Sequence, residues 1–349
     1  MTKVKTAILS FGMSGKVFHA PFLELLPGFE FAGAWERSKN QLSDYYPNAQ
    51  SFKTLESILE DESIELVVVN TPTYTHFEYA KLALDANKHV VVEKAFTTTV
   101  AEALELKELA ERKNLKLSVF QNRRWDSDFR TVKEIYSKGV LGEPVDVSFC
   151  FDRFNPALSP KQHKEVKGSG AGIVKDLGPH IIDQALHLFG FPDSLFAKLA
   201  ITRQYSEVDD YFKILLFYPR FNVELRGGYF FKEPTPSYTF HGTNGSFLKS
   251  RGDVQETQLQ RGMKPNAAEY GIEPEREYGI LNYVDGKQHV RELVQTLPGN
   301  YSNYYEGVYQ SIVEGSAMPV TADDGINVMK IIEAAFQSDL EKRVIPLKD

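Results

Sequence analysis

Short apolar runs alternate with helical stretches along the first third of the chain. The runs contain almost no polar residues, as expected for strands covered on both faces; they lie at 6–11, 29–35, 66–70, 89–93 and 117–120. The stretches between them repeat apolar positions at helical spacing; they lie at 14–26, 41–46, 76–86 and 100–113. Strand, helix, strand in repetition predicts a doubly wound, Rossmann-type parallel sheet over residues 1–122.

The pattern changes in the remainder, 123–349. Longer, aromatic-rich strand patterns appear there, at 145–154, 195–204, 211–218, 221–231 and 238–242. Helices are predicted at 128–138, 181–189 and 325–342, the last with the option of packing back on the first domain. Asn244-Gly245 is typical of a tight turn, and the long loop 155–172 is typical of an active-site lid. The fold class is therefore α/β, with a second, α+β domain built on a large, mostly antiparallel open sheet. This domain is predicted to bind substrate and form oligomers.

Charge and composition exclude several functional classes. The net charge of −7 argues against a nucleic-acid surface. No apolar run approaches the ~18 residues of a membrane span, and the first residues show no signal-peptide pattern. The single cysteine, Cys150, excludes an internal disulfide. A cytoplasmic protein that contacts neither nucleic acid nor membrane is expected.

A glycine-containing loop follows the first predicted strand, in the sequence SFGMSGKVFHAP. The dinucleotide pattern Gly-x-Gly-x-x-Gly reads here as Ser10, Gly12 and Gly15. Gly12 would let a pyrophosphate approach the backbone, and Gly15 would let the helix pack closely on the strand. The helix N-terminus would direct its partial positive charge at the phosphates. The alternative is an ordinary strand-to-helix turn that uses two glycines.

The end of the second predicted strand carries conflicting signals for cofactor choice. Glu36 suits the 2′-hydroxyl of NAD, whereas Arg37, Ser38 and Lys39 suit the 2′-phosphate of NADP. Two cations and a hydroxyl cluster there, and the glutamate can turn away into water. NADP is therefore favoured and NAD is the alternative. A solvated charged turn without a cofactor role is also consistent with these residues.

Polar residues follow three of the predicted parallel strands. Lys94 follows 89–93, Thr71-Pro72-Thr73 follows 66–70, and Asn122-Arg123-Arg124-Trp125 follows 117–120. In doubly wound sheets ligands bind outside the carboxyl ends of the strands, so these groups are expected to face one crevice. The alternative for Lys94 is a surface lysine whose stem lies along apolar neighbours.

A second polar cluster lies in KDLGPHIIDQALHLFG. Asp176, His180, Asp183 and His187 follow one another at helical spacing and predict one stripe of a helix. Asp176 could instead cap that helix, with Pro179 in its first turn, and His180 could be a core histidine. A metal site is disfavoured because the usual histidine and cysteine ligands are missing, so no metal is expected.

Together these motifs resemble the Gfo/Idh/MocA family over nearly the whole length, and within it the NADP-linked scyllo-inositol dehydrogenases. The resemblance implies a nicotinamide-dependent dehydrogenase or reductase that acts on CH–OH groups of a cyclic, inositol-like polyol or a sugar. It implies homodimers or homotetramers that form through the C-terminal sheet. The family's Glu-Lys-Pro reads Glu93-Lys94-Ala95 here, and alanine leaves the backbone freer than proline does.

The resemblance also implies roles for individual residues. The catalytic set is Lys94, Asp176 and His180. The substrate-binding set adds Arg124 and Arg153 to these three. The residues expected to hold the dinucleotide are Ser10, Gly12, Met13, Ser14, Gly15, Glu36, Arg37, Ser38, Thr71, Pro72, Thr73, His76, Glu93, Asn122, Arg123 and Trp125.

The chemistry of the groups indicates how the catalytic set would divide the work. A histidine pKa near ~6.5 suits a proton acceptor, which points to His180. A lysine pKa near ~10.4 makes a poor base, so Lys94 is expected to steady the alkoxide. Asp176 would orient a substrate hydroxyl and the lysine, and Asp183 the helix or the imidazole. Two alternatives remain open: a reductase of another carbonyl or an imine, and a non-catalytic sugar or dinucleotide sensor.

Overall fold

The computed structural model describes residues 2–37, 40–160, 165–168 and 170–348, which form two compact units. The first unit comprises Met1–Asn122, Gln255–Tyr270 and Asn300–Ile326. The second comprises Arg123–Val254, Gly271–Gly299 and Asn327–Asp349. Each unit is thus assembled from segments that lie far apart in the sequence.

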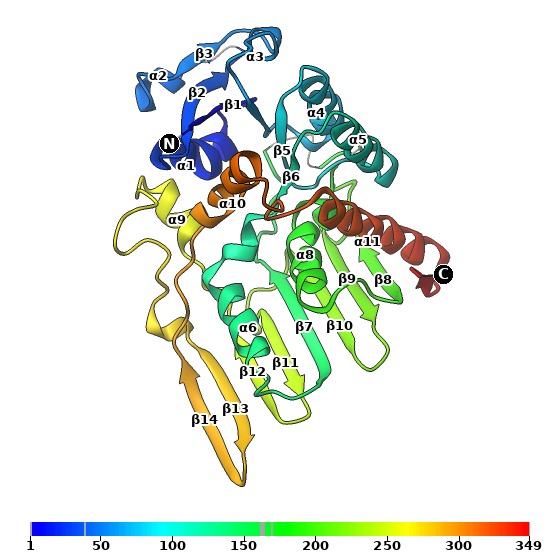
Figure 1. The fold of residues 1–349 in the computed structure, drawn as a ribbon. Coiled ribbons are helices and arrows are strands. Elements are labelled where there is room, and N and C mark those ends of the chain that lie inside the picture. Colours follow the sequence, from blue (N-terminus) through cyan, green and yellow to red (C-terminus); the bar gives the residue numbers. More distant parts are fainter. Residues whose placement is uncertain (1, 38–39, 161–164, 169, 349) are drawn as a thin grey trace. The chain divides into compact units, whose positions relative to one another are not determined.

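The first unit contains a six-stranded sheet in the order β3-β2-β1-β4-β5-β6 (Figure 1). Every pairing in it is parallel, which confirms the predicted Rossmann-type sheet. All residues of β4 and β6 are buried, because these strands are covered on both faces. The strands are β1 (Val4–Ile8), β2 (Phe29–Trp35), β3 (Gln50–Phe52), β4 (Leu66–Val69), β5 (His89–Glu93) and β6 (Leu117–Phe120).

Helices connect these strands. The predicted helix after β1 begins as a π-helix, η1 (Gly15–His19), and continues as α1 (Ala20–Leu25). Such π-turns are rare and occur frequently at functional sites. The remaining helices are α2 (Leu42–Tyr45), α3 (Glu56–Leu59), the 3-10 turn η2 (Thr73–Thr75), α4 (His76–Asp85) and α5 (Val100–Arg112). The sequence did not predict β3, α3 or η2, each of which has only three or four residues.

Two later segments complete the core of the first unit. Helix α9 (Gln255–Gln260) contacts η1, and α10 (Ser302–Glu314) contacts α1. Tyr304 and Tyr305 of α10 are fully buried, and their rings pack against aromatic residues of the sheet and of α1. The sequence predicted neither helix.

The second unit is built on a nine-stranded sheet in the order β14-β13-β12-β11-β7-β10-β9-β8-β15. Only the β7–β10 pairing is parallel, so the expected large, mostly antiparallel sheet is confirmed. Its strands are β7 (Pro144–Asp152), β8 (Ser194–Ala200), β9 (Tyr211–Phe217), β10 (Asn222–Gly228), β11 (Tyr238–Gly242), β12 (Gly245–Lys249), β13 (Gly279–Asp285), β14 (Gln288–Val294) and β15 (Ile345–Pro346).

Helices α6 (Ser127–Ser137) and α8 (Gly178–Phe189) lie against one face of this sheet (Figure 1). The short helix α7 (Ile173–Asp176) precedes α8, and the 3-10 turn η3 (Asn122–Trp125) precedes α6. Helix α11 (Ala322–Glu341) begins three residues before the predicted 325 and runs from the first unit into the second. The β13–β14 hairpin was not predicted, although Asp285-Gly286 between two strand patterns is a hairpin signal.

No helix among the described residues is long and apolar enough to cross a membrane.

Candidate functional site

The loop between β1 and η1 is closed by the residue that replaces the first glycine of the dinucleotide pattern. The Ser10 hydroxyl accepts a hydrogen bond from the Gly12 N–H at 3.3 Å, and the Ser10 carbonyl accepts one from Asn70 Nδ2 at 2.8 Å. A Cβ on Gly15 would lie 2.2 Å from the Ser10 carbonyl oxygen. Ser10 therefore serves the tight turn, and Gly15 is required by the close approach of η1 to the loop.

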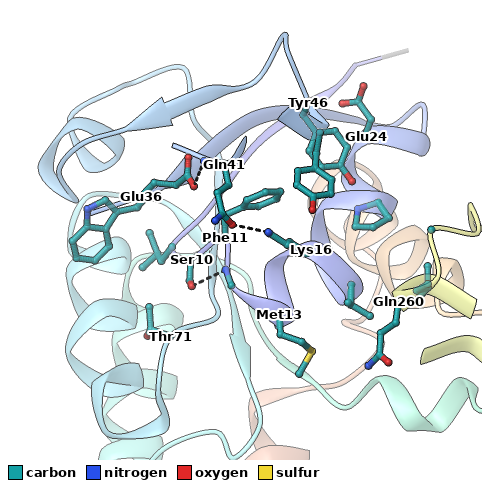
Figure 2. Close-up of a pocket in the computed structure, with 18 of the residues that line it drawn as sticks. Ser10, Phe11, Met13, Lys16, Glu24, Glu36, Gln41, Tyr46, Thr71 and Gln260 are labelled. Atoms are coloured by element: carbon teal, nitrogen blue, oxygen red, sulfur yellow. Dashed lines mark hydrogen bonds between the residues drawn. The ribbon is translucent and has the colours of Figure 1, made fainter. Parts of the chain in front are cut away.

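A cavity of about 1230 Å³ opens in the first unit beside this loop (Figure 2). It extends from the glycine loop to the end of β2 and to the turn after β4. Several residues predicted to hold the dinucleotide line it: Ser10, Gly12, Met13, Glu36, Arg37, Thr71 and Pro72. Ser38 and Lys39, predicted beside Arg37, lie outside the described residues.

Glu36 does not turn into water as expected. Its carboxylate accepts hydrogen bonds from the N–H groups of Gln41 (2.9 Å) and Leu42 (3.2 Å) and from the Ser51 hydroxyl (2.9 Å). The side chain is buried because the unpaired N–H groups at the start of α2 attract a carboxylate. The acceptor that would suit a 2′-hydroxyl is thus occupied, whereas Arg37 is exposed beside Trp35.

The lining of the cavity suits a dinucleotide in its chemistry. Gly12 is exposed in the loop before η1 and lines the cavity, so its backbone is open to the approach of a phosphate. Lys16 and Arg37 add positive charge to the lining. The Asn70 Oδ1 atom, directly after β4, is buried without a hydrogen-bond partner among the described residues.

Glu93, the last residue of β5, is held by three donors. Its Oε1 accepts hydrogen bonds from the Ser14 hydroxyl at 2.6 Å and from His19 Nε2 at 3.0 Å, and its Oε2 accepts the Lys94 N–H at 3.1 Å. Burial raises the pKa of Glu93, but the hydrogen bonds from His19 and Ser14 outweigh it and lower the pKa to about 2. Glu93 is therefore a fixed negative charge that joins the glycine loop to the residue bearing the predicted catalytic amine.

The ring of His19 is in turn oriented by a second buried side chain, that of Tyr305. Its Nδ1 lies 2.6 Å from the Tyr305 hydroxyl, and both side chains are fully buried. Since Nε2 faces the Glu93 carboxylate, we assign the ring proton to Nε2, and Nδ1 then accepts from Tyr305. This chain of contacts could not be predicted from local patterns, because Tyr305 lies 286 positions after His19.

His76 connects two strand ends. Its Nδ1 lies 2.8 Å from the Ala95 carbonyl oxygen and its Nε2 2.9 Å from that of Thr71. Burial lowers the pKa of His76. The peptide bond between Lys94 and Ala95 is cis, at the position where the family pattern has proline. His76 was predicted to touch the dinucleotide; in the structure its ring contacts the backbone after β4 and after β5.

In the second unit the predicted polar stripe is interrupted. Asp176 ends α7, Leu177 follows, and His180 lies in the first turns of α8. The start of α7 is held by Asp209, whose carboxylate accepts the Val174 N–H at 2.8 Å. Burial raises the pKa of Asp209 to about 6. Asp176 therefore does not share a helix with His180, and the N-cap position of α8 is occupied by Leu177.

Asp183 has a partner that the sequence did not predict. It binds Arg124 in a buried, bidentate ion pair, with Nε to Oδ2 and Nη2 to Oδ1 both at 2.7 Å. The sequence predicts that Asp183 orients the helix or the imidazole and that Arg124 binds substrate. In the structure Asp183 instead binds the guanidinium of Arg124. A contact between Arg124 and a substrate stays a prediction.

The ring of Phe151 gathers three of the predicted site residues. The guanidinium of Arg153 lies 5.0 Å from the ring centroid, that of Arg123 lies 5.4 Å away, and the His180 ring lies 6.1 Å away. The cation–π contact with Phe151 favours a fixed position for the Arg153 guanidinium.

Sequence reasoning missed two residues of this region. Burial, together with the charge of Asp176, raises the pKa of Tyr229 to about 12. Arg203 donates to Glu165 at 2.8 Å and to the Ala157 carbonyl at 3.0 Å, and so holds the described part of the predicted lid. Both contacts join residues about forty positions apart, and no local pattern signals them.

The predicted site residues divide between the two units. Lys94 belongs to the first unit, as do all the predicted dinucleotide residues except Arg123 and Trp125. Asp176, His180, Arg124 and Arg153 belong to the second. Convergence of Lys94 and His180 on one substrate therefore stays a prediction. Within the described ranges, no group of three or more histidine, cysteine, aspartate or glutamate side chains could hold a metal ion.

Comparisons with known proteins place the chain in a family. Residues 4–121 match "Oxidoreductase family, NAD-binding Rossmann fold", and residues 133–347 match "Oxidoreductase family, C-terminal alpha/beta domain". Scyllo-inositol 2-dehydrogenase (NADP(+)) IolW of Bacillus subtilis is 39% identical over 345 residues, covering 99% of this chain and 96% of that protein. YdgJ, an oxidoreductase of Escherichia coli, is 38% identical over 96% of both chains.

A solved structure agrees with these matches. That of yvaA from Bacillus subtilis gives a TM-score of 0.95 at 38% identity and covers 99% of both chains. The expectation of a nicotinamide-dependent dehydrogenase that acts on CH–OH groups is confirmed. The chain belongs to the Gfo/Idh/MocA family of oxidoreductases.

Proposed function

We propose that the protein transfers hydride between NADP and a secondary alcohol of a cyclic, inositol-like polyol or a sugar. One observation carries this proposal: Lys94 directly follows Glu93, whose carboxylate is fixed by three donors at the carboxyl end of β5. The same unit contains the dinucleotide-sized cavity. Support for the substrate class comes from the full-length similarity to an enzyme named for scyllo-inositol and NADP.

The preference for NADP over NAD is part of this proposal. The Glu36 carboxylate is engaged by two N–H groups and a hydroxyl, so it is withdrawn from a 2′-hydroxyl. Arg37 lines the cavity, and within the described part of the chain no carboxylate pairs with it. An exposed guanidinium at the end of β2 supports binding of a 2′-phosphate.

Three side chains would manage the proton and the developing charge. The bound dinucleotide supplies the hydride acceptor. His180 accepts the hydroxyl proton, because its ordinary pKa matches neutral pH. Lys94 donates a hydrogen bond to the oxygen as negative charge develops on it. Asp176 orients a neighbouring hydroxyl and the Lys94 ammonium, while Arg124 and Arg153 contact other hydroxyls of the ring.

Replacing Lys94 by alanine tests this assignment. We expect kcat to fall by about 100- to 1000-fold, because a preorganised donor to the oxyanion is lost. The Kd for NADP should change little. Activity is measured by NADPH absorbance with a panel of inositols, aldoses and deoxy-keto sugars. Lys81→Ala is a matched control, since Lys81 pairs with Glu105 on the surface and does not line the cavity. Equal losses of turnover and NADP binding would make Lys94 a cofactor or folding residue.

Assembly and location complete the proposal. The open face of the nine-stranded sheet, opposite α6 and α8, would pair with a second copy to form a homodimer or homotetramer. A cytoplasmic location agrees with the single free cysteine, Cys150, which is buried.

A further inference from the structure

A segment from the second half of the sequence belongs to the cofactor cavity. Residues 255–265, called here the 255–265 segment, lie in the chain between β12 and β13 of the second unit's sheet but are part of the first unit. Helix α9, which begins the segment, contacts η1, the π-helix that follows the glycine loop. The segment was not recognised in the sequence, because its neighbours in the chain belong to the other unit.

The segment is firmly anchored in the first unit. The fully buried side chain of Gln255 accepts the Tyr301 N–H at 2.8 Å, and Leu259 is also buried. Gly262 adopts a left-handed conformation (φ +83°) that ends the helix, and the Met263 N–H returns to the Gln258 carbonyl at 3.0 Å. The residues after Gly262 therefore leave the helix in a defined direction.

These residues form part of the cavity lining. Leu259, Gln260, Gly262, Met263, Lys264 and Pro265 border the same 1230 Å³ space as the glycine loop. Figure 2 shows Gln260 on the same side of the pocket as Met13 of the loop. The segment thus supplies a wall that the parallel sheet and its own helices do not.

The charges that line the cavity favour an anion. Its cations are Lys16, Arg37 and Lys264. Lys16 donates to the neutral amide of Gln41 at 2.7 Å, and Arg37 lies over Trp35. Across the described ranges, none of the three cations is in an ion pair with a carboxylate. Of the two acids in the lining, Glu24 and Glu36, the carboxylate of Glu36 is taken up by the start of α2.

We propose that Lys264 binds a phosphate group of the dinucleotide, so that the 255–265 segment is part of the cofactor site. The inference rests on the proposed function and adds a ligand residue to it. A lysine ammonium is a compact point charge that suits a phosphate oxygen. Because α9 and Gly262 already fix the backbone, binding would have to order little more than the lysine side chain.

Two single substitutions test the proposal in the full-length protein. Lys264→Ala removes the proposed ligand, and Arg261→Ala removes an exposed cation of the same segment that does not line the cavity. Both change the net charge equally, so the comparison isolates position from overall charge. Kd values for NADP and NAD are measured by calorimetric titration, and circular dichroism checks the fold.

We expect Lys264→Ala to raise the Kd for NADP about five- to tenfold and Arg261→Ala to change it less than twofold. An equal rise for NADP and NAD would assign Lys264 to the pyrophosphate, and a rise for NADP alone to the 2′-phosphate; either supports the proposal. If the two variants bind NADP equally well, the inference is overturned while the proposed function stands. If the wild-type protein binds neither dinucleotide, the proposed function falls as well.

Discussion

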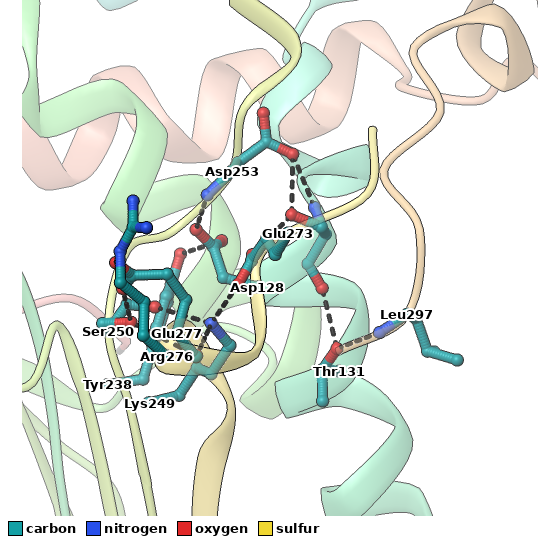
Figure 3. A network of polar contacts seen from close by, with 11 residues as sticks. Asp128, Thr131, Tyr238, Lys249, Ser250, Asp253, Glu273, Arg276, Glu277 and Leu297 are labelled. Atoms are coloured by element: carbon teal, nitrogen blue, oxygen red, sulfur yellow. Dashed lines mark hydrogen bonds and ion pairs between the residues drawn. The ribbon is translucent and has the colours of Figure 1, made fainter. Parts of the chain in front are cut away.

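Each unit buries a glutamate in a network of hydrogen bonds, and the two networks differ in what surrounds the carboxylate. In the first unit, the carboxylate of Glu93 accepts hydrogen bonds from Ser14, His19 and the Lys94 N–H. None of these three partners is an acid. Glu273 of the second unit lies 2.6 Å from Lys249 Nζ, and both side chains are fully buried (Figure 3). Glu273 also has a neighbouring acid, Asp128.

The second network joins several segments of its unit. The Ser127 hydroxyl donates to Glu273 at 2.5 Å and, alternatively, to Asp253 at 2.9 Å, and the Ser127 N–H donates to Asp253 at 2.8 Å. Lys249 also donates to the Glu277 carbonyl at 2.7 Å. Figure 3 shows these groups meeting between the start of α6 and the chain that follows β12. The network therefore holds the unit together.

The pKa values of the two glutamates are shifted in opposite directions. Burial and the hydrogen bonds together leave the pKa of Glu93 at about 2, below its ordinary value. For Glu273, burial and the charge of Asp128 raise the pKa, and they outweigh the attraction of Lys249. Hydrogen-bond donors and nearby positive charge thus lower the pKa of Glu93, whereas burial and a second acid raise that of Glu273. The difference suits Glu93 to positioning Ser14 of the glycine loop and Glu273 to structural cohesion.

Breaking the buried pair of the second unit should have the largest effect on stability. Glu273→Gln leaves the Lys249 ammonium buried without its carboxylate, which costs about 3–5 kcal/mol. Urea unfolding at pH 7 measures this loss. The Kd for NADP, measured below the transition, should not change, because the cavity lies in the first unit.

The paired substitution Lys249→Met with Glu273→Leu is the control. It removes both charges together, so most of the lost stability should return. A cost below about 1 kcal/mol for Glu273→Gln would show that the pair is not desolvated as the structure indicates. The raised pKa adds a signature: ionised Glu273 is penalised in the folded state, so its contribution to stability falls as pH rises above its ordinary pKa.

Removing the Glu93 carboxylate of the first unit should have the next largest effect on stability. Glu93→Gln should lower the unfolding free energy at pH 7 by about 3 kcal/mol, because the folded pKa of Glu93, about 2, lies well below its ordinary value. It should also weaken NADP binding several-fold, because glutamine has one acceptor oxygen instead of two and cannot hold Ser14, His19 and the Lys94 N–H together.

The pH dependence gives this prediction its sharpest form. Because the folded pKa of Glu93 is depressed, its contribution is fully present above about pH 4.5 and is lost as pH falls toward 2. The difference in unfolding free energy between wild type and Glu93→Gln should therefore shrink in acid. A difference that is independent of pH from 7 down to 3 would contradict the assignment of an ionised Glu93.

Features of the fold and the site could be predicted from the sequence where they depend on neighbouring residues, and not where they depend on residues far apart in the chain. The strand that ends in Glu93 was predicted with its observed bounds, because a doubly covered strand is a continuous apolar run. Lys94 could be singled out because the ends of such strands meet ligands. The hydrogen bonds of Glu93 could not be predicted, since they join residues up to 79 positions apart.

The wrong predictions also arise from interactions that local sequence patterns do not show. Glu36 was expected in water, but the unpaired N–H groups of α2, five and six residues later, bind its carboxylate. Asp176 and His180 have helical spacing, yet the helix is interrupted at Leu177. That α9 and α10 belong to the first unit depends on tertiary packing, which local periodicity does not report.

A pair of adjacent tyrosines provides the finest comparison. Tyr304 and Tyr305 are both fully buried in α10, and each hydroxyl has a buried partner: Ser118 at 2.8 Å for Tyr304 and His19 at 2.6 Å for Tyr305. Tyr304→Phe and Tyr305→Phe should therefore cost about the same stability, ~1 kcal/mol each. Only Tyr305 acts on the ring that holds Glu93, so only its loss frees His19 to change tautomer.

The functional readouts should then separate the two variants. We expect Tyr305→Phe to lower kcat about three- to tenfold and to alter its pH profile, because His19 no longer presents a fixed N–H to Glu93. Tyr304→Phe should retain wild-type kinetics at a similar melting temperature. Steady-state assays between pH 5 and 9, with melting curves on the same samples, measure both effects. Identical kinetics for the two variants would make Tyr305 a packing residue alone and would show that the Glu93 network does not influence the proposed role of Lys94.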